Sequence, residues 1–387
     1  MSRARIEGVD VARGVASLIM IQGHAYDGWV AAEHKESAAY LFTRLLGTLP
    51  LPAFLVLAGA AIVLRVDAAR ARGEDASKVR RSVLLRGFGV LGWAYAVSFA
   101  YAAMDGVDGL DTLLRADVLH VIGLSIMAFA LLGIGACAST PSPGGVRARS
   151  ASRGAEPPRG IVSPRRMTIA ALALLIVPTL LCPWLSPLGA EVHGPLRFAV
   201  ALFVDVPGVT LMPFVPLVSW LAAGALVAMA MLRARESAPP SLAGAPDRFF
   251  VIAGASALVV AIAASHATSL TVDALGGTLT RAHPAVWLNV IDLAARGVLV
   301  LAIAALLSTR VPAAVRRVLV RIGRGSLLAY VVHIPLCYGR AGELLRGRLD
   351  MATATLFVLL LMVFAWLAVL ARDSWRARGR CSVSSAT

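Results

Sequence analysis

Long apolar runs recur from one end of this chain to the other, and short polar stretches separate them. A helix needs about 20 consecutive apolar residues to cross a bilayer. The runs predict membrane helices at 12–32, 45–66, 86–104, 117–137, 168–188, 211–232, 249–268, 285–307, 318–338 and 352–371. The pattern is weakest over 196–216, where Pro207, Pro213 and Pro216 interrupt it. We therefore predict an all-α fold, a polytopic integral membrane protein with about ten transmembrane helices.

The composition agrees with a membrane protein. Hydrophobic residues make up 58% of the 387 residues and charged residues only 15%, against about a quarter in a soluble domain. The mean hydropathy is +0.76. The first apolar run is longer than the core of a signal peptide, and no small-residue cleavage site follows it. We expect this run to be retained as the first helix.

Lys and Arg gather in alternate loops, which predicts the orientation of the chain. The basic stretches are 65–86, 138–167, 233–248, 310–324 and 372–380. The stretch 104–117, between two predicted helices, carries four Asp residues against one Arg. Only 339–350 departs from the alternation, because it holds three Arg residues on the predicted outer side. The pattern predicts a multi-pass membrane protein with cytoplasmic N and C termini.

The net charge of +15 arises largely from these loops. Basic cytoplasmic loops attract anionic membrane lipid. The Arg residues are spread over many loops without interleaved aromatic residues, so nucleic-acid binding is not expected. The four cysteines show no paired spacing and the chain shows no metal-ligand spacing, so neither a disulfide framework nor a metal site is predicted.

A stretch rich in Ser, Pro, Gly and Arg divides the chain. We expect it to be a disordered cytoplasmic linker over 139–167. It separates a front transmembrane half, 1–138, from a back transmembrane half, 168–372. A cytoplasmic tail is expected over 373–387. No sequence repeat relates the two halves, and the oligomeric state is not indicated.

His24 lies about midway along the first predicted helix, beside Gln22 and Asp27. Ionisable side chains at membrane depth are costly and are usually functional. The neutral imidazole can act as a general base toward an acceptor hydroxyl or amine, or as a transient acyl carrier. The alternative is a structural histidine that hydrogen-bonds to a neighbouring helix.

Charged residues precede this helix and the third one. Asp10 and Arg13 are three residues apart, so they can pair or share a ligand. Arg80, Arg81 and Arg86 open the third helix from the same side. Guanidinium groups suit phosphate oxygens, so these five residues are candidates for binding a diphosphate. For each single Arg the alternative is ordinary anchoring on the cytoplasmic side.

Two further pairs stand at helical spacing. Asp117 and His120 open the fourth predicted helix, where the carboxylate can orient the imidazole or simply cap the helix. Asp292 and Arg296 lie in the eighth helix at salt-bridge spacing, which favours a structural pair within the membrane. His333 lies in the outer half of the ninth helix.

Several segments resemble the transmembrane acyltransferase superfamily, and within it the bacterial heparan-alpha-glucosaminide N-acetyltransferase-like family. They are residues 5–16 (RIEGVDVARGVA) with Met20 and His24, 51–59 (LPAFLVLAG), 117–123 (DVLHVIG), 213–220 (PFVPLVSW) with Gly224, and 323–333 (GRGSLLAYVVH). Ser219 stands before the tryptophan where the family pattern has none, which is a departure. The segments span most of the chain in the expected order.

The resemblance to a bacterial family implies a protein of the bacterial inner membrane. It also implies that cytoplasmic acyl-CoA, with acetyl-CoA as the expected donor, gives an acyl group to an acceptor nearer the outer face. His24 matches the first-helix histidine of the wider superfamily, whereas in the lysosomal branch the catalytic histidine lies further along, close to His34. We expect His24, with His34 and His120, on the catalytic side. Asp10, Arg13, Arg80, Arg81 and Arg86 are expected to bind the donor. Asp117 and His333 are expected to line the acceptor side.

The sequence therefore predicts a membrane O- or N-acyltransferase acting on a saccharide or cell-envelope acceptor. The alternative function is a multi-pass permease or efflux protein without covalent chemistry. A polar path across the whole bilayer would distinguish the permease, whereas a site closed around His24 would favour the enzyme.

Overall fold

The computed structural model describes residues 7–105, 110–134, 162–237, 246–276 and 278–384. In these ranges the chain is helical and forms no β-strand; two isolated bridges pair Val30 with Leu349 and Ala116 with Thr210. The predicted all-α fold is thus confirmed. The helices are α1 (Glu7–Trp29), η1 (Ala32–His34), α2 (Ala38–Gly47), α3 (Pro50–Ala71), α4 (Ala76–Asp105), α5 (Leu110–Leu113), α6 (Val118–Gly133), α7 (Pro164–Ala190), α8 (Leu196–Ala201), α9 (Phe214–Ser237), α10 (Pro246–Leu275), α11 (Val286–Ser308), α12 (Ala313–Arg324), α13 (Ser326–Cys337), η3 (Arg340–Gly342) and α14 (Met351–Ser384).

Each predicted membrane run falls mainly on one of these helices, except the ninth, which covers parts of α12 and α13. Fewer than ten of the described segments meet the length and hydropathy expected of a span. Seven described segments do so, and the bent pair α12–α13 would make an eighth. The apolar helix α6 is shorter, at 16 residues, and α1 carries charged residues near both ends. The chain is therefore a multi-pass, membrane-type helical protein.

Two predicted segments differ from the structure in their bounds. The predicted ninth span, 318–338, is not straight, because α12 and α13 meet at an angle of 79° around Gly325. The predicted linker and tail also overlap helices: α7 begins at Pro164, and α14 continues to Ser384. The greater part of the linker, 139–161, lies outside the described residues.

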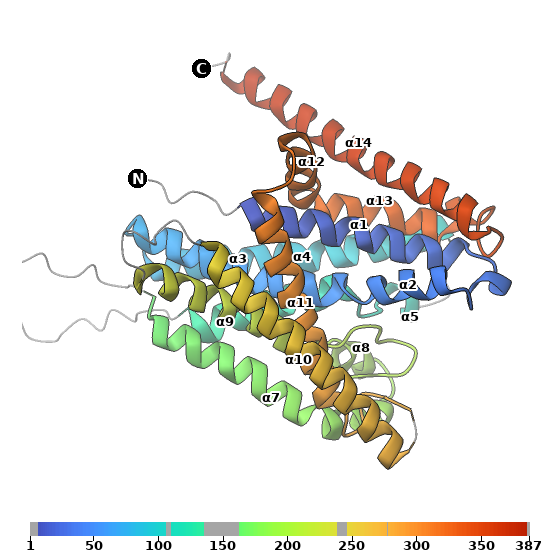
Figure 1. Ribbon diagram of the computed structural model, residues 1–387, viewed down its shortest axis with the longest axis horizontal. Helices are drawn as coiled ribbons and strands as arrows, with labels where there is room; N and C mark the ends of the chain where they lie inside the picture. The colour runs from blue at the N-terminus through green and yellow to red at the C-terminus, as the bar shows by residue number, and fades with distance from the viewer. Residues whose placement is uncertain (1–6, 106–109, 135–161, 238–245, 277, 385–387) are drawn as a thin grey trace, which may run out of the picture.

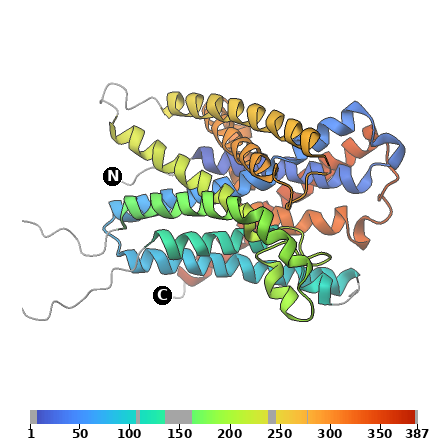
Figure 2. The same cartoon turned by 90° about the horizontal axis from the view of Figure 1, so that it is seen from below.

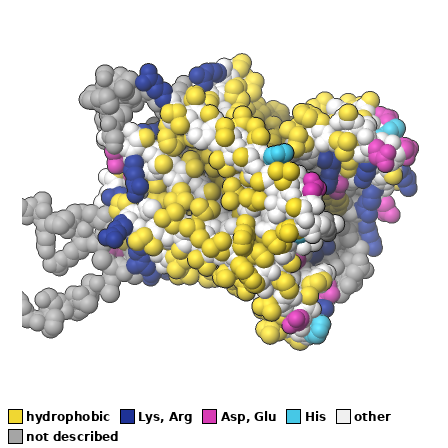
Figure 3. All heavy atoms as spheres, turned by 60° about the horizontal axis from the view of Figure 1, so that its bottom comes forward, with side chains coloured by type: hydrophobic (Ala, Val, Ile, Leu, Met, Phe, Trp, Pro, Cys, Tyr) yellow, Lys and Arg dark blue, Asp and Glu magenta, His cyan; other side chains and the backbone are white. Residues whose placement is uncertain are grey.

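The helices run lengthwise between two chemically different ends (Figures 1 and 2). We call the end where α1 begins, α3 turns into α4, and α14 finishes the basic end. Figure 3 shows Lys and Arg side chains at both ends and an apolar band over the middle, with the histidine and most of the acidic side chains of this face near the opposite end. An apolar band between two polar ends is what a bilayer requires of a spanning bundle.

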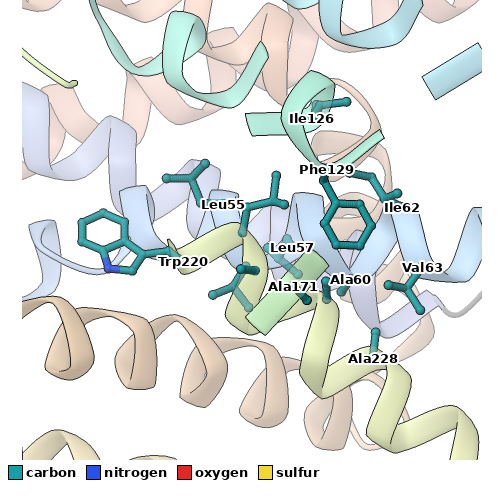
Figure 4. Close-up of a cluster of buried hydrophobic side chains, with 14 of the residues drawn as sticks. Leu55, Leu57, Ala60, Ile62, Val63, Ile126, Phe129, Ala171, Trp220 and Ala228 are labelled. Atoms are coloured by element: carbon teal, nitrogen blue, oxygen red, sulfur yellow. The ribbon is translucent and has the colours of Figure 1, made fainter. Parts of the chain in front are cut away.

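Helix α3 lies at the centre of the bundle. Its residues Leu55, Leu57 and Val63 pack with Phe129 of α6 and Trp220 of α9 in the main buried cluster (Figure 4). In α4, α7, α10 and α14, by contrast, most residues of the apolar stretch face the outside of the bundle. Apolar side chains on the outside of a helical bundle suit contact with lipid, so these four helices form the perimeter.

Close packing of α3 on α9 depends on glycine. A Cβ on Gly59 would lie 1.9 Å from the backbone oxygen of Leu221, and one on Gly224 would lie 1.9 Å from that of Val56. Small residues let membrane helices approach until their backbones touch. Both glycines belong to segments that resemble the acyltransferase family, so these two positions have a packing role.

Candidate active site

Helix α1 carries His24 to a cavity that opens toward the end opposite the basic end. Two contacts hold this part of α1 in place: Trp29 Nε1 donates to the Leu336 carbonyl oxygen at 2.9 Å, and the Tyr26 hydroxyl bonds the Thr355 hydroxyl at 2.7 Å. Gly28 allows the approach of α13, because a Cβ there would lie 2.5 Å from the Cys337 oxygen. His24 is half-buried and therefore keeps access to the cavity.

His24 forms a pair with His333 of α13. Nδ1 of His24 lies 2.8 Å from Nε2 of His333, and the two rings stack with centroids 5.1 Å apart. His333 is fully buried, and its Nδ1 lies 2.8 Å from the Ala329 carbonyl oxygen. A carbonyl oxygen only accepts, so Nδ1 of His333 carries the hydrogen and its Nε2 accepts in the neutral ring. His24 then donates through Nδ1, which leaves its Nε2 unprotonated.

Asp27 lies one helical turn beyond His24 and is held by several donors. Arg44 Nη1 donates to its carboxylate at 2.9 Å, and the hydroxyl groups of Tyr338 and Tyr40 donate at 3.0 and 3.5 Å. The ring of Tyr338 also contacts that of His24 edge-on, with centroids 5.6 Å apart. This network fixes the wall of the cavity beside the imidazole.

The cavity around His24 has a volume of about 1180 Å³, and we call it the opposite-end cavity. Trp220, Asn289, Asp292 and Arg296 line its far side. Arg296 binds Asp292 through two nitrogens, each 2.7 Å from a carboxylate oxygen, which confirms the predicted pair. Such a mixture of aromatic, amide and paired charged groups can bind a polar, uncharged molecule.

A second cavity of about 930 Å³ opens toward the basic end, and we call it the basic-end cavity. Six arginines and one carboxylate are its charged lining residues: Arg13, Arg65, Arg86, Arg324, Arg372, Arg376 and Asp373. Within the described chain, Nη1 of Arg65 is buried and makes no hydrogen bond. A buried donor without a partner costs stability, so this nitrogen is suited to a bound anion.

Other contacts hold the basic-end arginines in position. Nη2 of Arg65 donates to Glu74 at 2.9 Å, and the hydrogen bonds from Arg65 and Arg72 lower the pKa of the Glu74 carboxyl. Glu74 therefore stays ionised at neutral pH. Nε of Arg324 lies 3.3 Å from the buried carboxylate of Asp10, so α12 supplies an ion-pair partner for a residue that had been expected to act with Arg13.

The two cavities adjoin beside His24. Met20, Phe54, Val118 and Tyr330 line both of them. The Tyr330 hydroxyl is hydrogen-bonded to Asp117, which lines the opposite-end cavity. Molecules bound in the two cavities would thus meet at a junction lined largely by apolar side chains.

The structure separates the residues expected at the active site into distinct places. Arg13 and Arg86 line the basic-end cavity, whereas Arg80 and Arg81 lie on α4 away from the described lining of either cavity. His34 lies in η1 and likewise lines neither cavity. His333 stands behind His24 rather than on the cavity wall.

Asp117 and His120 form a capping box at the start of α6. The Asp117 carboxylate accepts from the backbone N–H groups of Leu119 and His120, and lies 2.9 Å from His120 Nδ1. The capping alternative is confirmed for Asp117. His120 is fully buried, with its ring edge-on to Tyr95, and is not among the described lining residues of either cavity.

Several lining residues had no functional prediction. Arg65, Arg324 and Arg372 stood in basic loops and served only as orientation signals. Arg372 and Arg376 are four residues apart on α14, a spacing that places both on one helical face and could have indicated a shared ligand. Tyr330 lies three residues before His333 and Tyr338 five residues after it, and this closeness in sequence was the available signal.

Comparison with known families gives a match to the N-terminal third of the chain. Residues 5–139 match the family model of the catalytic part of heparan-alpha-glucosaminide N-acetyltransferase. The predicted family resemblance is confirmed. The matched segment contains His24, Arg13, Arg65, Arg86 and Asp117, so it includes side chains of both cavities. The front segment of the chain is therefore similar to the catalytic part of a membrane acetyltransferase. No curated protein matches the chain.

Proposed function

We propose that the protein transfers an acetyl group from acetyl-CoA, bound in the basic-end cavity, to a hydroxyl or amine of a saccharide or cell-envelope acceptor in the opposite-end cavity. The observation that carries the proposal is the position of His24 where the two cavities adjoin. The basic end is assigned to the cytoplasm of a bacterial cell, with both chain termini on that side. The donor then comes from the cytoplasmic pool of acyl-CoA.

The lining of the basic-end cavity suits the donor. Coenzyme A carries a diphosphate and a further phosphate, and guanidinium groups bind phosphate oxygens through two parallel hydrogen bonds. Arg13, Arg65 and Arg86 stand on three helices around this cavity, and Nη1 of Arg65 supplies an unused donor. From Arg13 to His24 there are 11 residues, which a helix extends over about 16 Å. An extended pantetheine arm has a comparable length.

The tautomer of His24 supplies the base. Its unprotonated Nε2 takes the proton from the acceptor hydroxyl or amine as the acceptor oxygen or nitrogen attacks the thioester carbonyl carbon. The carbon–sulfur bond then breaks, and the proton passes from His24 to the departing sulfur. The products are the acetylated acceptor and coenzyme A with a free thiol.

The permease alternative needs a continuous polar path between the two ends. Three of the four residues shared by the cavities, Met20, Phe54 and Val118, are apolar. An apolar constriction next to a histidine supports transfer of a small group rather than passage of a whole polar molecule. These features favour the enzyme.

The test uses the purified protein in lipid nanodiscs with acetyl-CoA labelled in the acetyl group. Glucosamine provides an amine acceptor, and methyl glucoside provides hydroxyl groups alone. Transfer predicts one free thiol for each label on the sugar, and His24→Ala should abolish both. In proteoliposomes, uptake of labelled sugar without any release of thiol would instead establish the permease.

Label that remains on the protein in the absence of acceptor would identify an acyl-histidine route. General-base catalysis predicts that no such label accumulates. The same experiment therefore separates the two roles considered for His24.

A further inference from the structure

Helix α12 does not run with its neighbours. It makes an angle of 79° with α13, and Figure 1 shows it foreshortened where α1, α13 and α14 are seen from the side. It follows α11 at the basic end of the bundle. A helix at this angle to membrane-crossing helices lies close to the plane of the bilayer, at the level of the headgroups.

The sequence of α12 has two opposite faces. At 100° per residue, Val315, Val318 and Ile322 fall on one side. The opposite side carries the arginines of the helix, Arg316, Arg317, Arg321 and Arg324. Ile322 is buried against the bundle, whereas Val315 and Val318 remain 46% and 37% exposed. A docked helix with exposed apolar residues and a basic face is typical of the membrane interface.

The arginines of α12 line a hollow of about 420 Å³ together with Glu7 of α1 and Asp373 of α14. Their ion pairs are long: Arg316 to Glu7 is 3.5 Å, and Arg321 to Asp373 is 3.9 Å. Asp373 also accepts from Arg372 at 2.7 Å. Donors on the α12 arginines are therefore left for a further acceptor.

Positive charge exceeds negative charge in this hollow. The four arginines of α12 face Glu7 and Asp373 within it, and Arg324 pairs with Asp10 beside it. Arg317 has no hydrogen-bond or ion-pair partner among the described residues. One monoanionic phosphodiester would balance this excess and provide oxygens for several guanidinium groups.

We propose that α12 binds the phosphate of an anionic membrane lipid through Arg316, Arg317 and Arg321. Val315 and Val318 face its acyl chains. A lipid fits better than free phosphate, because exposed apolar residues and guanidinium groups occur on one helix at the interface. An anionic headgroup fits better than a choline headgroup, because guanidinium groups repel a quaternary ammonium. These three arginines do not line the basic-end cavity, so the lipid site is separate from the proposed donor site.

The experiment measures lipid retention by native mass spectrometry of the purified full-length protein. Phosphatidylglycerol and phosphatidylcholine of the same chain length are titrated in parallel. The test variant combines Arg316→Gln, Arg317→Gln and Arg321→Gln. The control combines Arg70→Gln, Lys78→Gln and Arg165→Gln, which removes the same charge from exposed positions at the same end. We expect the test variant to bind phosphatidylglycerol roughly 10- to 100-fold more weakly, and the control to bind like the wild type.

Three results would overturn the proposal. Equal weakening in both variants means that the basic end attracts lipid only through its total charge. Equal retention of phosphatidylcholine by the wild type means that no anionic headgroup is selected. Displacement of phosphatidylglycerol by millimolar inorganic phosphate means that the site binds the soluble ion. If the triple variant does not fold, Arg317→Gln alone decides, because this side chain has no partner to lose; about fivefold weaker binding supports the proposal and unchanged binding overturns it.

Discussion

The two cavities share four lining residues but differ in how their charged residues are arranged. In the opposite-end cavity the lining holds three carboxylates and three arginines, and the carboxylates of Asp27, Asp117 and Asp292 each contact a partner within the protein. In the basic-end cavity six arginines face one lining carboxylate, Asp373. Charges balanced within the lining leave a site for a neutral polar molecule, whereas a lining with more guanidinium groups than carboxylates selects a polyanion. One bundle thus offers different chemistry to two substrates.

The most complete contrast between the two ends concerns their exposure to the outside of the cell. We expect Leu344→Cys, at the opposite end and 80% exposed, to react fully with an impermeant maleimide in intact cells, because the opposite end faces outward. Ser77→Cys, in the first turn of α4 at the basic end, should react only after lysis. Both are introduced after the four native cysteines are replaced. Strong labelling at 77 in intact cells would invert the orientation and remove the basic-end cavity from cytoplasmic acyl-CoA.

His24→Ala should lower the rate of acetyl transfer by about two to four decades, since it removes the general base. Donor binding should be retained, because His24 does not line the basic-end cavity. Initial-rate assays measure acetyl transfer, and calorimetric titration with acetyl-CoA measures donor binding. His34→Ala is the matched control and should be much milder, because His34 lines neither cavity. An active His24→Ala protein together with an inactive His34→Ala protein would move the catalytic residue to η1.

Arg86→Ala should raise the KM for acetyl-CoA, because Arg86 lines the basic-end cavity. Loss of a hydrogen bond to a charged group is worth about 1.5–3 kcal/mol, or roughly one to two decades in affinity. Arg81 stands five residues earlier on α4 and lies outside the described lining of the cavity, so Arg81→Ala should have a smaller effect. Initial rates over a range of donor concentrations compare them. A larger effect at Arg81 would place the phosphates outside the cavity.

His333→Leu should lower kcat and leave the KM for acetyl-CoA unchanged, since His333 acts only through His24. The substitution leaves Nδ1 of His24 without an acceptor, at a cost of about 1–3 kcal/mol, or roughly 5- to 150-fold in rate. His333→Gln can again present an oxygen to His24 and should restore part of the activity. Equal activity of the Leu and Gln variants would show that His333 only fills space.

Much of the helical architecture could be predicted, because the hydropathy of a membrane helix is a local property of the chain. The bend between α12 and α13 could not. Residues 318–338 form one apolar run, and hydropathy does not distinguish a straight helix from two helices that meet at Gly325. The bend depends on how α12 packs across the bundle, which the local sequence does not specify.

The candidate site could be predicted only in part from the sequence, for a related reason. His24 and Arg13 stand out because ionisable groups are unusual in an apolar helix. The pairing of His24 with His333 joins residues 309 positions apart, and no local pattern specifies it. Likewise, Arg65 and Arg81 have the same signal in sequence, a cation in a basic loop, but α3 turns Arg65 toward the cavity and α4 leaves Arg81 exposed.

The position of His24 in the opposite-end cavity, beside the junction with the basic-end cavity, has an energetic consequence. In the proposed reaction an acetyl group moves outward and the acceptor proton moves inward to the thiol of coenzyme A. The neutral acceptor becomes a neutral product and the thioester becomes a neutral thiol, so neither side of the membrane gains or loses charge. A charge that crossed the membrane completely would gain or lose about 2.3 kcal/mol per 100 mV. This exchange avoids that term, so the free energy of the thioester alone drives the modification of molecules that the cytoplasm never contacts.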